Sequence, residues 1–129
     1  MSLIDDIKLN EGFRGLVYKD TLGFDTIGYG TKLPLTEEEG ELILQHRLGE
    51  KIEELNQRMP LYRTLPIDKR QIIAEMAYQL GVSGVINFKN MWKALGRGDY
   101  NSAAVEMLDS RWAKQTPTRA KKLAEKMRL

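Results

Sequence analysis

Two carboxyl groups and a hydroxyl near the start of the chain could do chemistry together. Glu11 continues the apolar helical stripe of Ile4 and Ile7, where a carboxyl is costly to bury as an anion unless it is paired or functional. Asp20 lies nine residues on, at the mouth of a predicted hairpin, and we expect it to be exposed. Thr26 follows, with a hydroxyl that can donate and accept. One carboxyl kept protonated, one kept ionised and a hydroxyl to hold water are the minimum equipment for cleaving a glycosidic bond.

Each of these positions also has a purely structural interpretation. Glu11 could rotate to solvent at the frayed end of its helix, and Asp20 could serve only as a turn residue. It is the combination of the three side chains, more than any one of them, that favours a catalytic role.

The elements that would position these side chains are a short helix and a small sheet. Ser2 is a suitable N-cap and Gly12 a natural stop, so residues 3–11 are predicted to form an amphipathic helix. Residues 16–20 and 24–31 are rich in β-branched and aromatic types and flank a turn at 21–23. We expect these segments to form a three-stranded antiparallel sheet.

Helices are predicted for most of the remaining chain. Thr36 and Glu39 have the spacing of a capping box ahead of a helix of about twenty residues. Residues 68–80 are the most apolar helical segment, and we expect a turn at 81–84 to end it. Shorter helices are expected over 88–95, over 101–108 and after Pro117.

The predicted fold class is therefore α+β. It combines a small N-terminal lobe, which holds the three-stranded antiparallel sheet, with a larger all-helical C-terminal lobe. We expect residues 1–129 to form a single domain, with lobes at about 1–35 and 60–129 joined by a long helix at about 36–58. A cleft between the lobes would be the natural place for a site.

Composition excludes several classes of protein. The chain has 20 Lys and Arg against 18 Asp and Glu, a formal charge of +2 that disfavours a globally basic nucleic-acid binder. Cysteine is absent, which excludes disulfides, thiolate metal sites and cysteine nucleophiles, and the single histidine, His46, disfavours zinc sites and a Ser/His/Asp triad. No stretch approaches the roughly 20 apolar residues of a transmembrane helix, so we expect a soluble cytoplasmic product.

The last part of the chain is more basic than the rest. The segment Asp109–Leu129 carries seven basic and two acidic residues. Such a segment could attract a polyanionic surface, such as a bacterial envelope or a nucleic acid, or it could simply be a solvated helix face.

Several short motifs resemble those of the phage-type lysozymes, the endolysin family of glycoside hydrolases. In the first part of the chain they are Glu11–Arg14, Tyr18–Asp20 and Thr26–Gly30, with eight residues between the Glu and the Asp and five between the Asp and the Thr. Downstream, Tyr78–Gly81 resembles the family's cleft-lining segment. The family's C-terminal signature is matched by Ser110–Trp112, Gln115–Pro117 and Arg119–Lys121. The resemblance runs from residue 3 to about residue 122 in the right order, and the joint pattern is highly specific.

The resemblance implies a lysozyme-like fold and cleavage of the β-1,4 bond between N-acetylmuramic acid and N-acetylglucosamine in peptidoglycan. It implies inversion at the anomeric carbon, without a cofactor or a metal. Glu11 would be the general acid, Asp20 would help to activate water and stabilise charge on the sugar, and Thr26 would position that water. The substrate would also be contacted by Tyr78 and Gln79, and Arg119 would pair with Glu11.

The partners that the resemblance implies are the glycan strands of peptidoglycan and a separate phage protein, a holin. The enzyme would wait in the cytoplasm of the host bacterium and act in the periplasm after release through the holin pore. It would be a monomer with no nucleic-acid partner and no membrane anchor.

Two departures from the family pattern stand out. Many relatives carry histidine where this chain has Thr31, so any ion pair made from that position is absent. The chain is also shorter than the best-known member, between the sheet and the long helix and at the C-terminus. The first departure leaves the predicted catalytic residues in place, and the second affects the outer rim of the expected cleft.

Two other functions stay open. A catalytically silent relative could bind the cell wall, although a binding protein has no need of a carboxyl on an apolar stripe. A small nucleic-acid-binding protein could use the basic C-terminal helix, although no recognised binding motif accompanies it. Trp112 could stack on a sugar, but an aromatic residue in an amphipathic helix favours a place in the core.

Overall fold

The structure is a computed structural model that describes residues 2–129. Its contacts divide the chain into two compact units, one ending at Ile43 and the other spanning Leu44–Leu129. The boundary falls within the long helix α2 (Glu37–Arg58). Each unit is described by itself.

The first unit begins with helix α1 (Leu3–Glu11), as predicted. Ser2 caps it through a complete capping box, because its hydroxyl accepts from the Asp5 N–H while the Asp5 carboxylate accepts from the Ser2 N–H. Gly12 ends the helix with a positive φ of 69°. These local signals fix Glu11 as the last helical residue.

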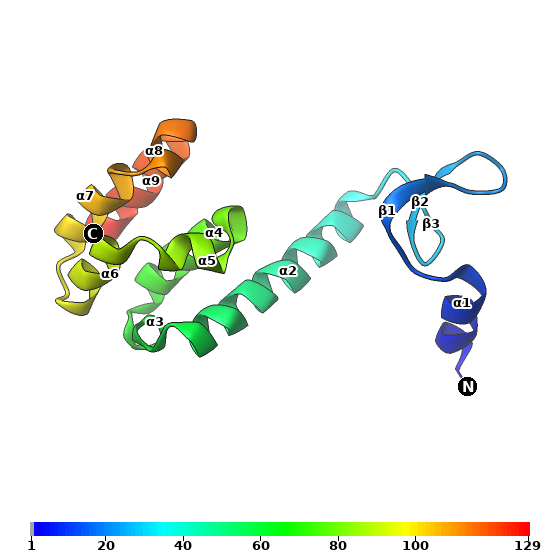
Figure 1. Cartoon of the computed structure of the whole chain (residues 1–129), viewed down its shortest axis with the longest axis horizontal. Coiled ribbons are helices and arrows are strands. Elements are labelled where there is room, and N and C mark those ends of the chain that lie inside the picture. The colour runs from blue at the N-terminus through cyan, green and yellow to red at the C-terminus, as the bar shows by residue number, and fades with distance from the viewer. Residues whose placement is uncertain (1) are drawn as a thin grey trace. The chain divides into compact units, whose positions relative to one another are not determined.

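Three antiparallel strands follow in the order β1-β2-β3: β1 (Arg14–Lys19), β2 (Asp25–Gly28) and β3 (Thr31–Lys32) (Figure 1). Thr26 on the central strand pairs with Tyr18 on one side and with Lys32 on the other. Directly opposed residues project from the same face of a sheet. Tyr18, Thr26 and Lys32 therefore form one row across all three strands.

The turn between β2 and β3 lies against the end of α1. Gly28 and Gly30 both have positive φ, 70° and 74°, which favours glycine. A Cβ atom at Gly28 would meet nothing within 4 Å, whereas one at Gly30 would overlap the Glu11 carboxyl group. The Glu11 carboxyl can therefore lie against residue 30 because that residue has no side chain.

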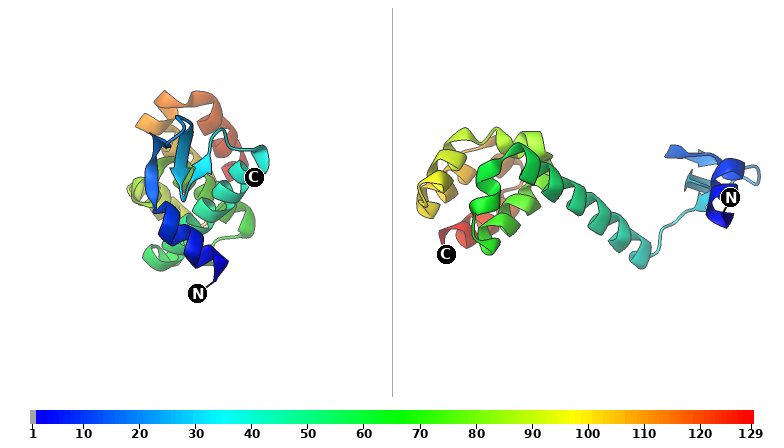
Figure 2. Two further views of the ribbon diagram at one scale, coloured as in Figure 1. Left: turned by 90° about the vertical axis from the view of Figure 1, so that its right-hand side faces the viewer. Right: turned by 90° about the horizontal axis from the view of Figure 1, so that it is seen from below.

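The second unit is helical (Figure 2). It contains most of α2, which begins with the predicted capping box of Thr36 and Glu39. The helices that follow are α3 (Pro60–Thr64), α4 (Ile67–Leu80), α5 (Val82–Ile86), α6 (Lys89–Gly96), α7 (Tyr100–Leu108), α8 (Arg111–Gln115) and α9 (Pro117–Arg128). Helix α7 packs against both α6 and α9.

The hydrophobic core lies in this second unit. Its fully buried side chains include Ile73 and Met76 on α4, with one methionine each from α6, α7 and α9. Trp112 is buried as predicted, at 4% exposure, and packs edge-on against Phe88 with ring centroids 6.2 Å apart. Methionine side chains are flexible enough to fill the irregular space between short helices.

Lys69 is a buried cation that joins three helices of this unit. Its side chain is 2% exposed, and its ammonium donates to the backbone carbonyl of Lys126 on α9 at 3.2 Å. The ammonium also pairs with Asp68 at 3.2 Å and lies 4.7 Å from the ring centroid of Tyr100 on α7. A buried ammonium is tolerated only with such compensation, so Lys69 stabilises the packing of α4, α7 and α9.

The predicted fold class is confirmed: an N-terminal three-stranded antiparallel sheet is followed by helices. The prediction of a turn at 81–84 is wrong. Gly81 ends α4 with a positive φ, and the chain continues at once into α5. The burial of Val82 and Val85 stabilises that short helix. The short helices α3 and α8 were not predicted. In residues 2–129, no helix is long and apolar enough to cross a membrane.

Ile73→Ala is expected to lower the free energy of unfolding by about 2–5 kcal/mol, because it opens a cavity at a side chain with no exposure. Ile67→Ala, on the same helix at 60% exposure, is the matched control and should change it by less than about 0.5 kcal/mol. Urea unfolding followed by circular dichroism measures both. Equal effects would contradict the assignment of Ile73 to the core.

Gly30→Ala is expected to destabilise the protein more than Gly28→Ala. Both substitutions put a Cβ on left-handed backbone, at a cost of roughly 1–2 kcal/mol. Only the change at Gly30 also drives a methyl group into the Glu11 carboxyl. The same unfolding measurement compares the two variants, and equal losses would show that Glu11 does not lie on Gly30.

Candidate active site

Asp20 is the most firmly held of the predicted site residues. Its Oδ1 accepts from the backbone N–H groups of Leu22 and Phe24, at 2.9 and 2.8 Å. Its Oδ2 accepts from the ammonium of Lys32. The side chain is 13% exposed, so the expectation that Asp20 is an exposed carboxylate is wrong. The turn folds back over the side chain because its own N–H groups need an acceptor there.

Lys32 is the cation of this site. Its hydrogen bond to Asp20, followed by the N–H of Phe24, holds the pKa of the Asp20 carboxyl below its ordinary value. In return, Asp20 raises the pKa of the Lys32 ammonium, and the nearby charge of Glu11 raises it further. Asp20 is therefore kept ionised, and both predicted carboxyl groups act on one ammonium.

Thr26 is completely buried in the row between Tyr18 and Lys32. Its hydroxyl donates to the backbone carbonyl of Phe24 at 2.8 Å. Because a hydroxyl has one proton and two lone pairs, Thr26 is left as an acceptor. A water molecule that reached it would donate to Thr26 and keep a lone pair free to attack.

Glu11 is exposed and lies over Gly30, two residues before Lys32. The expected burial of this carboxyl is not present within the first unit, because the apolar stripe that it continues, including Ile4 and Ile7, is itself exposed there. The first unit thus brings Glu11, Asp20 and Thr26 to one small sheet. It holds Asp20 and Thr26 by hydrogen bonds and Glu11 by its contact with a glycine.

Tyr78 and Gln79 lie at the end of α4 in the second unit. Tyr78 is 39% exposed, and Gln79 is half-buried. The side-chain oxygen of Gln79 accepts from the indole N–H of Trp112 at 2.8 Å. That bond fixes the amide and leaves its N–H₂ group to donate elsewhere.

Arg119 on α9 pairs with Glu75 on α4, where its Nε donates at 3.1 Å. Together with Tyr78, these two side chains line a largely apolar pocket of about 660 Å³. Other parts of its wall come from Leu44, Leu48, Ile52 and Ala74. The second unit therefore brings together two of its three predicted site residues, while Gln79 is tied to Trp112. The predicted pairing of Arg119 with Glu11 joins residues of different units and stays a prediction.

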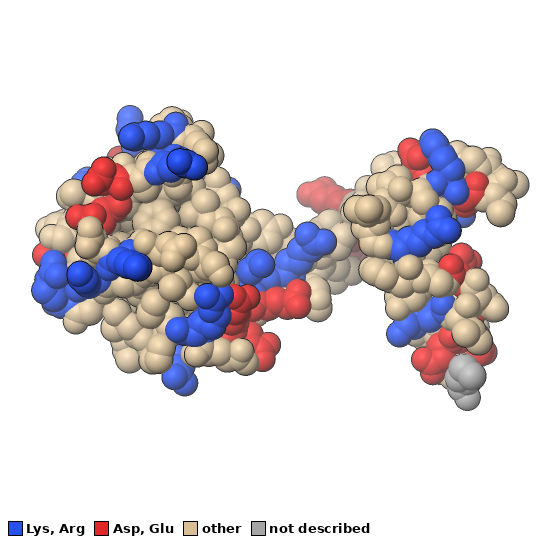
Figure 3. Space-filling view, in the orientation of Figure 1, with Lys and Arg blue, Asp and Glu red and all other residues tan. Residues whose placement is uncertain are grey.

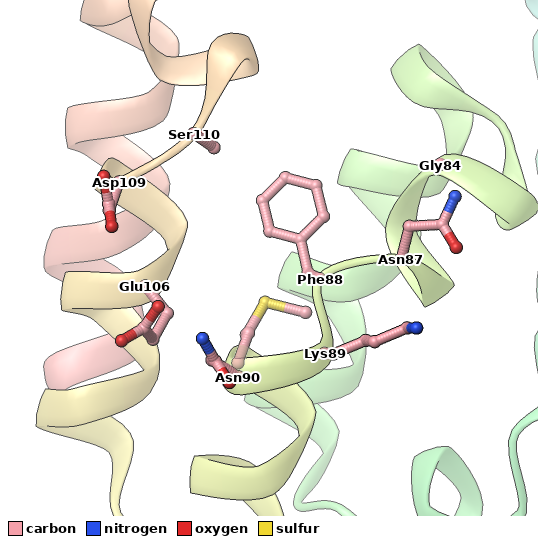
Figure 4. A pocket seen from close by; sticks show the side chains of 9 residues that line it. Gly84, Asn87, Phe88, Lys89, Asn90, Glu106, Asp109 and Ser110 are labelled. Carbon is pink, nitrogen blue, oxygen red and sulfur yellow. The ribbon is translucent and has the colours of Figure 1, made fainter.

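A separate, more polar pocket of about 250 Å³ lies among α5, α6 and α7 (Figure 4). The ring of Phe88 projects between Ser110 on one side and Asn87 on the other, and Glu106 and Asp109 lie along the α7 wall. None of the predicted site residues lines it. Phe88 links it to the site only indirectly, through its contact with Trp112, which bonds Gln79.

The sequence analysis missed two residues of this arrangement, Lys32 and Glu75. Lys32 could have been found from the length of the turn after β2, because that length places Lys32 opposite Thr26. A signal for Glu75 was its helical spacing of three and four residues from Tyr78 and Gln79. Within residues 2–129, no group of three or more His, Cys, Asp or Glu side chains is arranged to hold a metal ion.

Known proteins are similar to this chain over nearly its whole length. A family model described as "Phage lysozyme" matches residues 8–128. "Probable T4-type lysozyme 1" of Dictyostelium discoideum is 27% identical, in an alignment that covers 95% of this chain and 91% of that protein. "Probable T4-type lysozyme 2" of the same organism is 26% identical with the same coverage.

A third relative is much larger than this chain. It is the "Pre-baseplate central spike protein Gp5" of Enterobacteria phage T4, 27% identical in an alignment that covers 95% of this chain and 27% of that protein. All three alignments extend over 154 residues, whereas the chain has 129, so these relatives carry insertions that the chain lacks. Because the family match runs from α1 to the last turn of α9, the chain belongs to the phage lysozyme family.

Proposed function

We propose that this chain is a peptidoglycan hydrolase that cleaves the β-1,4 bond between N-acetylmuramic acid and N-acetylglucosamine, with inversion at the anomeric carbon. The observation that carries the proposal is the bonding of Asp20. Its carboxylate is held ionised by Lys32 and by two backbone N–H groups, next to the sheet that bears Thr26 and against which Glu11 of α1 lies. A fixed anion beside a second, free carboxyl is what this chemistry requires.

In the proposed reaction, Glu11 protonates the glycosidic oxygen as the bond to the anomeric carbon breaks. Asp20 stabilises the positive charge that develops on the sugar ring and takes a proton from the attacking water. Thr26 accepts a hydrogen bond from that water and so directs its lone pair. The commitment of the Thr26 proton to the Phe24 carbonyl supports this role, because it leaves the hydroxyl oxygen as an acceptor.

The second unit would bind the glycan strand. Tyr78 is exposed enough to contact a sugar, and the free N–H₂ group of Gln79, oriented by Trp112, could donate to one. Arg119 uses its Nε on Glu75, which leaves the other N–H groups of the guanidinium for a second carboxylate. Its proposed partner is Glu11.

The names of the relatives support the same class of reaction, since two of them are called probable T4-type lysozymes. We further propose that the chain is a phage or prophage endolysin that acts as a monomer. It would be made in the cytoplasm of the host bacterium and reach the wall in the periplasm through a holin pore.

Binding to nucleic acid is the less favoured alternative. The exposed face of α9 is basic, with Lys121, Lys122 and Arg128 all exposed. However, the face of the molecule seen in Figure 3 mixes Lys and Arg with Asp and Glu over the helical unit. A continuous basic field, which nucleic-acid binding favours, is not present on that face.

Glu11→Gln tests the proposed reaction, because it keeps the shape of the side chain and removes the acid. Activity is measured as dye release from purified peptidoglycan sacculi. Loss of a general acid should lower the rate by about 10²-fold to 10⁴-fold. Glu38→Gln, at an exposed position in the first turn of α2, is the matched control and should keep full activity.

The outcomes separate the candidate functions. A native protein that binds sacculi without cleaving them would be a silent wall-binding relative. Equal activity of native protein and the folded Glu11→Gln variant would show that the acid lies elsewhere. Proton NMR of the first product formed reports its anomeric configuration, and retention would contradict the inverting reaction.

A further inference from the structure

We propose that Lys32 is a positioning residue of the hydrolase site, whose ammonium fixes the orientation and charge of the Asp20 carboxylate while Asp20 acts on water. The inference rests on the proposed function. Neither the family motifs found in the sequence nor the matches to known proteins point to this lysine.

The register of the sheet directs Lys32 toward the site. Lys32 lies directly opposite Thr26, and Thr26 lies opposite Tyr18. All three side chains leave the sheet from one face, so the ammonium crosses the face that bears the Thr26 hydroxyl before it reaches Asp20. An ion pair in this place adjoins both groups that would hold the attacking water.

The two oxygens of Asp20 are held by different means. Oδ1 is fixed by the N–H groups of Leu22 and Phe24, which belong to the turn and are independent of Lys32. Oδ2 accepts from Lys32. Oδ2 is therefore the oxygen with lone-pair capacity left for a water molecule, and Lys32 is the group that sets its direction. Loss of the ammonium would leave the turn intact and release only this oxygen.

The acidic groups around the Lys32 ammonium are those of the proposed site, which is not the case for a second lysine of the sheet. Asp20 contacts the ammonium, and the carboxylate of Glu11 on α1 acts on it through space. The neighbouring ion pair of Lys19 and Asp25, at 2.7 Å, is formed by the last two paired residues of β1 and β2, beside the turn. Lys19 thus provides a lysine of the same sheet whose ammonium pairs with Asp25 and not with Asp20.

The experiment compares Lys32→Met, Lys32→Arg and the control Lys19→Met. Values of kcat and KM are measured against pH on soluble peptidoglycan fragments, and the Asp20 carboxyl is titrated by carbon-13 NMR in each protein. Because Lys32 is the largest cause of the lowered pKa of Asp20, Lys32→Met should raise that pKa toward its ordinary value. The acid limb of the kcat profile should then move to higher pH.

We expect Lys32→Met to lower the maximal kcat by about tenfold to a hundredfold, as for a misplaced catalytic group, with little change in KM. Lys32→Arg should restore most of the rate and the native acid limb, because a guanidinium also donates to a carboxylate. Lys19→Met should match the native protein in rate, acid limb and Asp20 titration. Circular dichroism establishes that each variant is folded.

Three results would overturn the proposal. The first is an unchanged Asp20 titration in Lys32→Met. The second is a changed titration with an unchanged kcat profile, which would make the ion pair purely structural. The third is a faster Lys32→Met enzyme, which would mean that Lys32 blocks the water site. Failure of the proposed function is distinct, because the native protein would then leave the peptidoglycan fragments uncleaved, whereas the titration still reports whether Lys32 holds Asp20.

Discussion

The geometry of the first unit depends on the carboxylate of Asp20. Its three donors come from two different places in the chain: the turn after β1, through Leu22 and Phe24, and β3, through Lys32. With two backbone bonds on one oxygen and an ammonium on the other, a single charged group fixes the turn and ties the far strand to it. Hydrogen bonds to a charged acceptor are stronger than neutral ones, so this small sheet gains much of its order from one anion. The charge that shapes the hairpin is also the charge that hydrolysis would use.

The two carboxyl groups of the proposed site are held by opposite means. Asp20 is nearly buried and accepts three hydrogen bonds, and these keep it ionised. Glu11 is exposed at the end of a helix and is placed by a steric gap, the missing side chain of Gly30. A carboxyl that must be ionised when water attacks benefits from fixed donors, whereas a general acid, which must be protonated at that moment, benefits from few. The different ways in which the two carboxyl groups are held are consistent with the different roles proposed for them.

Local signals in the sequence were enough to predict much of the fold. Ser2 with Asp5 and Thr36 with Glu39 act over three residues, so the starts of α1 and α2 could be read directly. The ion pairs of Lys32 with Asp20 and of Arg119 with Glu75 could not be predicted in this way. The first depends on the strand register, and the second depends on how α4 and α9 pack together. The burial of Asp20 was missed for a related reason: a turn aspartate and a catalytic aspartate look alike until the donors around them are known. The catalytic roles of Glu11, Asp20 and Thr26 remain proposals.

The family pattern that the sequence resembles has a histidine at the position of Thr31, which raises the question of whether Lys32 is simply a displaced version of that charge. The register of β3 argues otherwise. Thr31 pairs with Ile27 and Lys32 with Thr26, and neighbouring residues of a strand project to opposite faces of the sheet. A cation at position 31 would leave the sheet from the Ile27 face, away from Thr26. The charge of Lys32 is on the face of the proposed site, where it can act on the reacting carboxylate itself. A cation at position 32 therefore lies where it can pair with Asp20, whereas one at position 31 would project from the opposite face.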